Sequence, residues 1–436
     1  MEKEFLSLAR CAQVVLLLVS SALPMHAQFK VYDKIEDFDD NGYAVVYNNY
    51  ATDQQTSGVI DKSGREIVPL NYYEVRLMNS DVATVEKKYK GMQALFSLKS
   101  GKQITDFKYY WVSFYGDKGF AETENGNEII DSKGKTILKT NLEDADHLGD
   151  GFLFKRIGDN CMLYNFSGEP ISKEIFWDAY HFGGEGVDRI KPENGWIKVW
   201  MQNDIHDTNL VSHWLCNDGT LLSDDEYMSK IKHRTITFRY DYETREYEVI
   251  STSDGHVMSS IKADDWISDE GRNILVHRYG EGWGIIGYDG KVIVPCGYYE
   301  YIHGFSEGLT FAKDAQGNEF FMDYNGKNVL DLSGNNMQRA SRCYIFKNGL
   351  FGIKQNGREG FINRNGRIVI PAQFKEVRSF KDGHAIVEDF QERYGMIDTL
   401  GNFVVPPCYK ECYHDTKGFA KVKLDNGKWT IVKIHQ

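Results

Sequence analysis

Ten similar units follow one another along most of this 436-residue chain, and the repetition limits the folds open to it. Each unit has an apolar run, a polar turn that ends in glycine, and a second apolar run. The clearest copies read "GVIDKSGREIVP", "GIIGYDGKVIVP", "GFINRNGRIVIP" and "GMIDTLGNFVVP", and they begin at Gly58, Gly284, Gly360 and Gly395. A unit this small cannot bury its apolar face alone, so neighbouring units must stack on one another.

The turn glycines mark the period of the repeat. They are Gly64, Gly101, Gly134, Gly168, Gly219, Gly255, Gly290, Gly326, Gly366 and Gly401, spaced 33 to 40 residues apart except for one interval of 51. Glycine reaches positive φ without strain, and the Asp or Asn three residues earlier can accept hydrogen bonds from the turn amides. The pattern therefore predicts a β-hairpin at each glycine.

The remainder of each unit is also extended. Proline closes the second apolar run, as in "REIVP", and we expect the strand to stop there or to lie at an edge, because proline cannot donate to a ladder. An aromatic-rich block then leads through a turn into an alternating strand, as in "YYEYIHGFSEGLTFAKD" (298–314). Helical periodicity is nearly absent, and the best helical candidate is 223–232.

These features predict an all-β fold. We expect a tandem array of about ten antiparallel hairpin or meander repeats of about 35 residues each, spanning 28–436. The array could be propeller-like or an open, curved β-solenoid. The repeats are degenerate over about 90–275, and an insertion lies near 195–214. The N-terminal half-unit and the C-terminal "GKWTIVKIHQ" are expected to act as atypical caps.

The stretch "GWGIIG" (282–287) fits the dinucleotide-binding pattern G-x-G-x-x-G. Its last glycine, Gly287, corresponds to Asp61, Asn363 and Asp398 in the sister copies. A β-branched run follows, whereas a dinucleotide site needs a helix whose N-terminus holds the pyrophosphate. We therefore expect a strand here and no nucleotide cofactor.

Residues 1–27 resemble a signal peptide. Lys3 and Arg10 supply a weakly positive start, "AQVVLLLVSSAL" is an apolar core too short to span a bilayer, and "MHA" offers a small residue before Gln28. The chain carries a net charge of −12, and no basic run exceeds Lys87-Lys88. We expect an exported chain without a membrane span that does not bind nucleic acid, because that partner requires clustered basic residues.

The repeats resemble those of the WG-repeat proteins. The signature is Trp-Gly, an apolar pair, a turn, a strand ending in proline and a downstream "FSEGL". The seventh unit carries it through Trp283, Gly284, Pro295, Phe305, Ser306, Glu307 and Gly308. Three other units replace the tryptophan with Ser57, Glu359 and Tyr394. The resemblance implies a bacterial β-repeat array with at most an interaction role, and it supplies no catalytic residues.

Two segments could hold a metal ion. "DFDDNG" (37–42) begins like a calcium loop with Asp37, Asp39 and Asn41, but position 12 is Asn48 where a bidentate glutamate is needed. The insertion "NDIHDTNLVSHW" (203–214) clusters Asp204, His206, Asp207 and His213 in what we expect to be a loop. We interpret the first as a plain turn and the second as a solvated loop, so no metal, cofactor or catalytic residue is assigned.

Aromatic side chains offer a possible binding surface. Trp111, Trp177, Trp196, Trp200 and Trp266 could stack against sugars or peptides, although such residues more often cap the core between repeats. Six cysteines follow the leader: Cys161, Cys216, Cys296, Cys343, Cys408 and Cys412. We expect most of them to be small buried residues, with Cys296 and Cys408 partly buried. Cys408 and Cys412 are the closest pair and could form a disulfide.

The primary hypothesis is a non-enzymatic binding or scaffold protein of the bacterial envelope, in the periplasm or at the cell surface. Its partner would be a protein or a glycan. One alternative is an envelope hydrolase acting on glycan or peptide, with its site in the irregular 195–247 region. A purely structural spacer is the third possibility. The ligand-binding residues are unknown at this point.

Overall fold

The computed structural model describes residues 30–139, 145–157, 160–171, 176–177, 194–202, 210–231, 235–241, 243–263, 266–414 and 418–434. The predicted leader, 1–27, lies outside these residues. The chain forms two compact units, and each is described by itself. The N-terminal unit comprises 38–237 and 252–255, and the C-terminal unit comprises the residues up to 37, 238–251 and 256–436.

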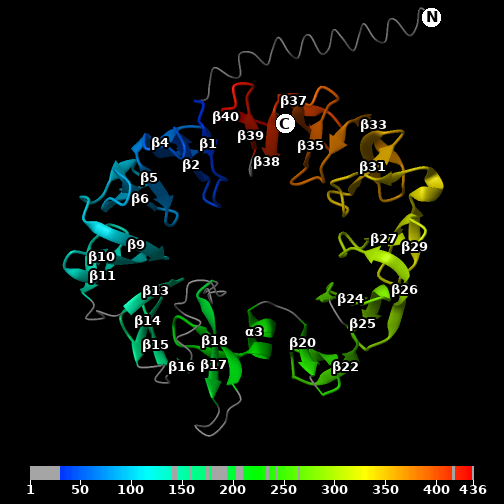
Figure 1. The fold of residues 1–436 in the computed structure, drawn as a ribbon, viewed down its shortest axis with the longest axis horizontal. Coiled ribbons are helices and arrows are strands. Elements are labelled where there is room, and N and C mark those ends of the chain that lie inside the picture. The colour runs from blue at the N-terminus through cyan, green and yellow to red at the C-terminus, as the bar shows by residue number, and fades with distance from the viewer. Residues whose placement is uncertain are drawn as a thin grey trace, which may run out of the picture. The chain divides into compact units, whose positions relative to one another are not determined.

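The fold is all-β and antiparallel, as predicted (Figure 1). The described residues contain one α-helix, α3 (Asp224–Lys230), which falls within the segment predicted to be helical. Ser223 caps this helix: its hydroxyl accepts from the Glu226 amide, while the Glu226 side chain accepts from the Ser223 amide. No helix among the described residues is long and apolar enough to cross a membrane.

The N-terminal unit is built from short sheets that follow chain order. One contains β2 (Tyr43–Asn48), β3 (Thr56–Asp61) and β4 (Glu66–Tyr72). The next runs in the order β12-β11-β10-β9-β7-β6-β5, with β8 also paired to β7. Its strands are β5 (Glu74–Leu77), β6 (Val82–Glu86), β7 (Gln93–Ser97), β8 (Lys102–Gln103), β9 (Tyr109–Tyr115), β10 (Lys118–Thr123), β11 (Gly126–Asp131) and β12 (Thr136–Lys139). Two further sheets contain β13 (Ala145–Gly149), β14 (Phe152–Ile157), β15 (Asn160–Asn165) and β16 (Phe176–Trp177), then β17 (Trp196–Gln202), β18 (Leu210–Cys216) and β19 (Leu221–Ser223).

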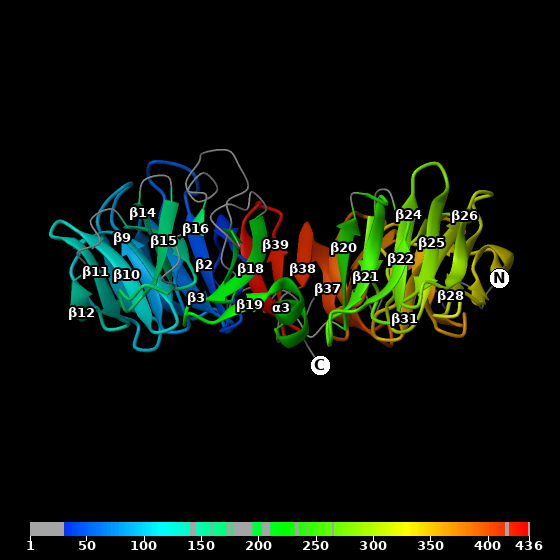
Figure 2. The ribbon, with the colours of Figure 1, turned by 90° about the horizontal axis from the view of Figure 1, so that it is seen from below.

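The C-terminal unit repeats the same plan. Strand β20 (Ile236–Asp241) begins two residues before this unit and pairs in the order β20-β21-β22 with β21 (Glu246–Ser251) and β22 (Val257–Ile261). A longer sheet contains β23 (Trp266–Asp269), β24 (Asn273–Arg278), β25 (Gly282–Gly287), β26 (Val292–Ile302), β27 (Thr310–Asp314), β28 (Glu319–Met322) and β29 (Asn328–Asp331), and the short 3-10 helix η2 (Ser333–Asn335) follows it. The last three sheets contain β30 (Gln338–Arg339), β31 (Leu350–Gln355), β32 (Arg358–Asn363) and β33 (Ile368–Phe374); β34 (Glu376–Val377), β35 (His384–Glu388), β36 (Tyr394–Asp398) and β37 (Phe403–Tyr409); and β38 (Glu411–His414), β39 (Phe419–Lys423) and β40 (Trp429–Lys433). In Figure 2, β20, β21, β22, β24 and β25 stand side by side with similar orientations.

All ten predicted turn glycines have positive φ, between 65° and 92°. The first turn shows why the sequence folds this way, because Asp61 Oδ1 accepts from the amides of Ser63 at 2.9 Å and Arg65 at 3.1 Å. The same pair of bonds recurs at Asn363 and Asp398. The segment "GWGIIG" is strand β25, which leads through a turn at Gly290 into β26. The expected absence of a helix after Gly287 is therefore confirmed.

The prediction that the second strand stops at its proline or lies at an edge is confirmed in part: β4 and β33 are edge strands, whereas β26 pairs on both sides, and none of the three stops at the proline. Strand β33 continues through Pro371, and the equivalent strands β4 and β26 continue through Pro69 and Pro295. The ladder bulges at these points: Phe361 pairs with Ile370, but Glu359 pairs with Phe374. A bulge leaves residues unpaired, so proline's missing N–H costs no ladder hydrogen bond there.

The bulge also explains the glycine that begins each clear repeat. A Cβ on Gly360 would lie 2.5 Å from the carbonyl oxygen of Ile370, and one on Gly395 would lie 2.7 Å from that of Val405. The backbone of the neighbouring strand lies so close to these glycines that a side chain of any size would force the two strands apart.

The N-terminal segment, expected to be an atypical cap, contacts the last hairpin. Tyr32 pairs with Trp429 of β40, and Lys421 of β39 bonds to the carboxylate of Asp37 at 2.6 Å. Strand β1 (Lys34–Ile35) follows Tyr32 in this segment. The Tyr32–Trp429 contact is an isolated bridge beside the three-stranded sheet β38–β40, and β1 itself pairs with β2.

Candidate functional site

One position of the repeat is defined by its pairing. The residue that starts the hairpin strand lies opposite an aromatic residue of the following strand in five units: Ser57 opposite Tyr72, Gln93 opposite Tyr109, Trp283 opposite Tyr299, Glu359 opposite Phe374, and Tyr394 opposite Tyr409. We call it the tryptophan position. The partner is aromatic in all five units, so the strand with the tryptophan position keeps the same register. The residue at the tryptophan position differs from unit to unit.

An unbroken line of ring contacts begins at the tryptophan position of the C-terminal unit. Trp283 lies 5.0 Å from His277, its partner on β24, and 5.6 Å from Tyr301 on β26, measured between ring centroids. Tyr301 continues to His303 at 5.9 Å, and His303 to Tyr344 at 5.5 Å. We call these five residues the aromatic row. Tyr301 and Tyr344 keep 37% and 43% of their surface exposed, so the row is open to solvent.

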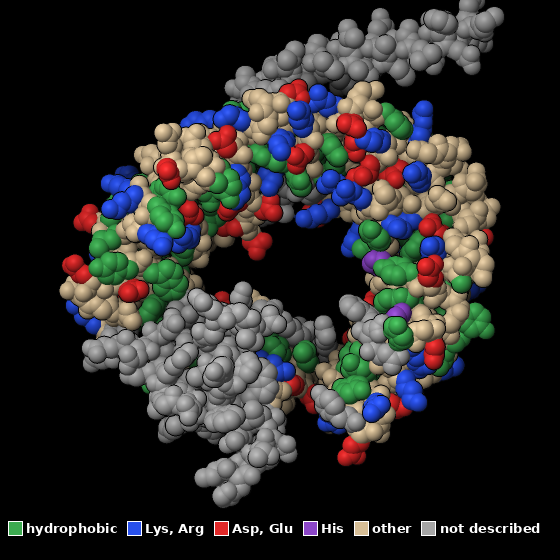
Figure 3. All heavy atoms as spheres, viewed as in Figure 1, with side chains coloured by type: hydrophobic (Ala, Val, Ile, Leu, Met, Phe, Trp, Pro, Cys, Tyr) green, Lys and Arg blue, Asp and Glu red, His purple; other side chains and the backbone are tan. Residues whose placement is uncertain are grey.

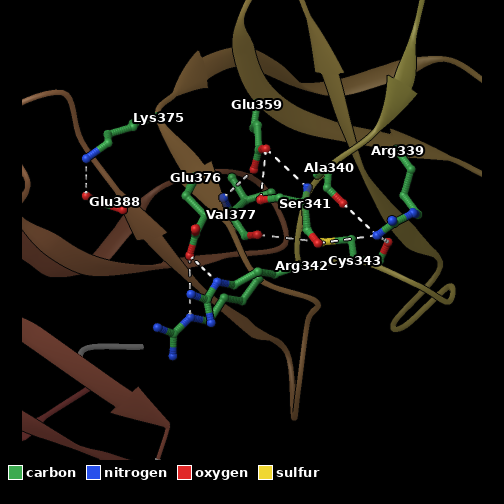
Figure 4. A network of polar contacts seen from close by, with 11 residues as sticks. Arg339, Ala340, Ser341, Arg342, Cys343, Glu359, Lys375, Glu376, Val377 and Glu388 are labelled. Atoms are coloured by element: carbon green, nitrogen blue, oxygen red, sulfur yellow. Dashed lines mark hydrogen bonds and ion pairs between the residues drawn. The ribbon is translucent and has the colours of Figure 1, made fainter.

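Arg339 stands at the end of the aromatic row. Its guanidinium carbon lies 4.3 Å from the ring centre of Tyr344, and Nη1 donates to the carbonyls of Ala340, Ser341 and Cys343 at 3.2–3.3 Å (Figure 4). Within the described part of the chain, no carboxylate forms an ion pair with it. Arg339 therefore presents a positive charge that is held in place by backbone oxygens but is not neutralised.

A second cluster, rich in basic residues, follows along the chain. The Glu376 carboxylate lies between Arg342 Nε at 2.8 Å and Arg378 Nε at 3.9 Å. Arg378 also lies 5.8 Å from the ring centres of both Tyr394 and Tyr413. Tyr394 occupies the tryptophan position of its own unit, so two successive repeats contribute to this cluster.

The cluster ends on the last hairpin. Lys421 lies 5.5 Å from the ring centre of Tyr413 and 5.8 Å from that of Trp429, while Lys423 lies 5.2 Å from Trp429. We call Arg342, Arg378, Tyr394, Tyr413, Lys421, Lys423 and Trp429 the basic cluster. Figure 3 shows histidine and hydrophobic side chains next to one another on one side of the C-terminal unit, with lysine and arginine side chains further along the same unit.

The surroundings of His303 favour the neutral imidazole. Burial and the nearby positive charge of Arg339 lower the pKa of His303, while the Gly304 amide and Glu270 act in the opposite direction. The Gly304 amide donates to Nδ1 at 2.9 Å, which leaves Nε2 as the nitrogen that carries the proton. His303 can therefore offer a ligand one N–H donor beside two aromatic rings.

Where the tryptophan position holds a polar residue, that side chain binds the next stretch of backbone. Glu359 is 2% exposed and accepts from the Val377 amide at 2.8 Å and from the Ser341 amide at 3.2 Å (Figure 4). Gln93 accepts in the same way from the Val112 amide at 3.1 Å. The tryptophan position therefore has two roles. The aromatic Trp283 contributes to the exposed row, and a Glu or Gln at this position joins neighbouring strands.

The structure describes only part of the two segments that were considered as metal sites and interpreted as a turn and a loop. In 37–42, Asp39 accepts from the Tyr43 amide at 2.8 Å and Asp37 pairs with Lys421, so the segment is a turn, as interpreted. Asp204, His206 and Asp207 lie outside the described residues. His213 belongs to strand β18 opposite Val199, not to a loop. The described residues contain no group of three or more His, Cys, Asp or Glu side chains placed to hold a metal ion.

Two of the five tryptophans considered as a binding surface have side chains that the structure describes. Trp111 lies 6.2 Å from Phe120 and packs against a buried cluster, and Trp196 lies 5.5 Å from the buried Tyr227. These two residues cap the core rather than forming an exposed surface. The side chains of Trp177, Trp200 and Trp266 lie outside the described residues. Sequence reasoning missed the aromatic row because only Trp283 of its five members occupies the tryptophan position, and the rings that meet it come from other strands.

The comparison with known families agrees with the repeats seen in the structure. The family model described as "WG containing repeat" matches residues 58–90, 283–315, 360–389 and 394–429. The chain contains WG repeats. Three of these four WG repeats carry most of the aromatic row and the basic cluster, and the fourth forms the start of the N-terminal unit.

Solved structures resemble the chain only distantly. One is the extracellular domain of a putative hybrid two-component system from B. thetaiotaomicron, with 14% identity and a TM-score of 0.26 over 91% of this chain. The chain spans only 55% of that protein's length. Another is BamB from Moraxella catarrhalis, with 9% identity and a TM-score of 0.24 over 93% of this chain and 96% of BamB. No curated protein matches the chain.

Proposed function

We propose that this WG-repeat protein is an exported, non-enzymatic binding protein that holds an extended glycan along the aromatic row and the basic cluster. The observation that carries the proposal is the unbroken series of ring contacts from His277 to Tyr344, which ends on the unpaired charge of Arg339. Aromatic rings bind the apolar faces of sugars, and arginine and imidazole N–H groups donate to their hydroxyl and carboxyl oxygens.

The proposal of binding without catalysis rests on what the row contains. Its titratable members are His277, His303 and the hydroxyls of Tyr301 and Tyr344, and none of its five residues is a carboxylate that could act as a partner acid or base. Glycoside hydrolysis ordinarily uses a pair of carboxylates that flank the scissile bond. The alternative, an envelope hydrolase with its site in 195–247, depends on Asp204, His206 and Asp207, which lie outside the described residues.

Export is part of the same proposal. It is supported by the composition of residues 1–27, which combine a weakly positive start, a short apolar core and a small residue before Gln28. Fractionating cells that express the full chain and measuring the intact mass of the recovered protein tests this. A mass that corresponds to a chain beginning near Gln28, found outside the cytoplasm, supports export, whereas an uncleaved cytoplasmic chain contradicts it.

Binding is tested by titrating soluble oligosaccharides into the protein and following tryptophan fluorescence. Trp283→Ala and Tyr301→Ala should each weaken binding about two- to tenfold, since one ring contact is worth about 0.5–1.5 kcal/mol. Tyr298→Ala is the matched control, because Tyr298 lies on the same strand and is 69% exposed but takes no part in the row. Equal affinity of the control and row variants, or no binding of any oligosaccharide, would contradict the proposal.

A further inference from the structure

A hollow of about 600 Å³ lies in the N-terminal unit, whereas the aromatic row belongs to the C-terminal unit. Its lining comes from three segments, residues 53–56, 71–73 and 87–89, and consists of Asp53, Gln54, Gln55, Thr56, Asn71, Tyr73, Lys87, Lys88 and Tyr89. The volume falls within the range of ligand sites, about 300–1,000 Å³, and is enough for one or two sugar rings.

Two lengthened hairpin loops form this hollow. The loop between β2 and β3 runs from Asn49 to Gln55, whereas the equivalent connections of later units cover only 279–281 and 356–357. The loop between β6 and β7 is also long and runs over 87–92. Insertions in repeat proteins lie in loops on one face, and that face is often the binding face.

The longer loop is held in a fixed, strained shape. Ala51 has a φ of 61°, a left-handed conformation that alanine rarely adopts. The Gln55 side chain holds it there, because Oε1 accepts from the Ala51 amide at 2.9 Å while Nε2 donates to the Tyr73 carbonyl at 3.1 Å. Backbone strain maintained in this way by a neighbouring side chain is typical of binding sites.

The exposed groups of the hollow are mainly aromatic, amide and basic side chains. The rings of Tyr73 and Tyr89 meet edge to face with their centroids 5.9 Å apart, and Tyr89 is 67% exposed. The side-chain amides of Gln54 and Asn71 and the Lys88 amine have no hydrogen-bond or ion-pair partner among the described residues. In a chain of net charge −12, the run Lys87-Lys88 concentrates positive charge here, opposed within the lining by Asp53 alone.

We propose that this hollow binds one anionic sugar residue, a pyranose that carries a carboxylate or a sulfate. The ring would lie against Tyr73 and Tyr89, the Gln54 and Asn71 amides would bind its hydroxyls, and Lys88 would pair with its negative group. Lys87 contributes positive charge while its amine stays 4.6 Å from the Phe107 ring centre. This site is independent of the aromatic row and of the function proposed for it.

The test is a calorimetric titration of the full chain with galacturonate, galactose 6-sulfate and galactose. We expect the two anionic sugars to bind about tenfold more tightly than galactose, because a hydrogen bond to an ionised group is stronger than one between neutral groups. Binding of the carboxylate alone or of the sulfate alone identifies which anion fits, and each supports the proposal. Equal binding of all three sugars, or no binding of any, overturns it.

Substitutions in the lining test whether the hollow is the binding site. Lys88→Gln should remove the preference for anionic sugars, and Tyr89→Ala should weaken all three titrations. Lys99→Gln is the control, since Lys99 is a lysine of the same unit that pairs with Asp81 and is 73% exposed. Trp283→Ala must leave these titrations unchanged, which separates this site from the aromatic row. A loss in Lys99→Gln equal to that in Lys88→Gln would show a nonspecific charge effect and overturn the assignment.

Discussion

Tyr32 and Trp429, which lie near opposite ends of the sequence, exchange two backbone hydrogen bonds. The Tyr32 amide donates to the Trp429 carbonyl at 2.9 Å, and the Trp429 amide donates to the Tyr32 carbonyl at 2.7 Å. The Tyr32 side chain is 2% exposed. The last sheet, β38–β40, is therefore joined at its β40 edge by a two-hydrogen-bond bridge to a residue that precedes the first repeat.

Tyr32→Pro should loosen the last sheet, because proline cannot donate the Tyr32 hydrogen bond. Hydrogen exchange followed by mass spectrometry should show faster exchange over β40, above all at the Trp429 amide. Tyr32→Ala is the control that removes the buried ring but keeps the amide, so its effect on this amide should be smaller. Unchanged protection of β40 in the proline variant would contradict the pairing.

Glu359→Leu should destabilise the C-terminal unit by about 1–3 kcal/mol, because it leaves the buried Val377 amide without an acceptor. Glu359→Gln should cost less, since Gln93 shows that an amide oxygen can accept the equivalent bond. Urea unfolding monitored by tryptophan fluorescence measures the shift in midpoint for both variants. Equal losses for leucine and glutamine would show that the hydrogen bond to Val377 contributes little.

Gly360→Ala should be more harmful than Gly357→Ala. A Cβ at Gly360 meets the Ile370 carbonyl at 2.5 Å, and overpacking of this kind costs about 1–3 kcal/mol. Gly357 has a φ of 77° but nothing within 4 Å of its would-be Cβ, so its substitution costs only backbone strain. Thermal unfolding of the two variants compares the effects, and a larger loss at Gly357 would contradict the close-approach explanation.

His303 should titrate below the ordinary histidine value of 6.5, since burial and Arg339 lower its pKa. The unfolded chain then binds more protons than the folded one as the pH falls through 6.5, so the contribution of His303 to stability is present above that pH and is lost below it. Histidine-selective NMR measures this pKa directly. Arg339→Gln should raise it, and a value above 6.5 in the unmodified protein would contradict the assigned surroundings.

The cysteines should remain thiols. Among the described side chains, Cys216, Cys296, Cys343, Cys408 and Cys412 form no disulfide, so the one considered for Cys408 and Cys412 is absent there. Burial raises the pKa of both Cys343 and Cys412 to about 12, and neither should react with maleimide in the folded protein. Cys408 is exposed, not partly buried as predicted, and should react first. Intact mass before and after reduction, with labelled-site mapping, checks both points.

Much of the fold could be predicted because its signals are local. The turn glycines and the Asp or Asn before each of them act within five residues, so positive φ at Gly64 or Gly401 can be recognised without knowing any neighbour. The continuation of β33 past Pro371 could not be predicted in this way. It depends on the bulge that brings Gly360 against the Ile370 carbonyl, a contact between two strands.

The candidate sites were less predictable for a related reason. Trp283 and Tyr394 were identified as variants of one motif position, but the sequence does not state which side chains meet them. The contacts of Trp283 with Tyr301 and of Arg378 with Tyr394 follow only from strand register. The hollow near Tyr89 depends on two loops of different hairpins, which no single motif describes.

The pairing of Tyr32 with Trp429 has a consequence for the order in which the molecule is assembled. Tyr32 is synthesised long before β40, so its backbone N–H and C=O have no partner on β40 until that later strand has been made, and an exposed backbone edge attracts other chains. Lys30, Asp33, Lys34, Glu36 and Asp37 lie close to Tyr32 in the sequence, and charged residues beside an exposed edge disfavour premature association. A chain that stops before β40 would retain this unsatisfied edge permanently.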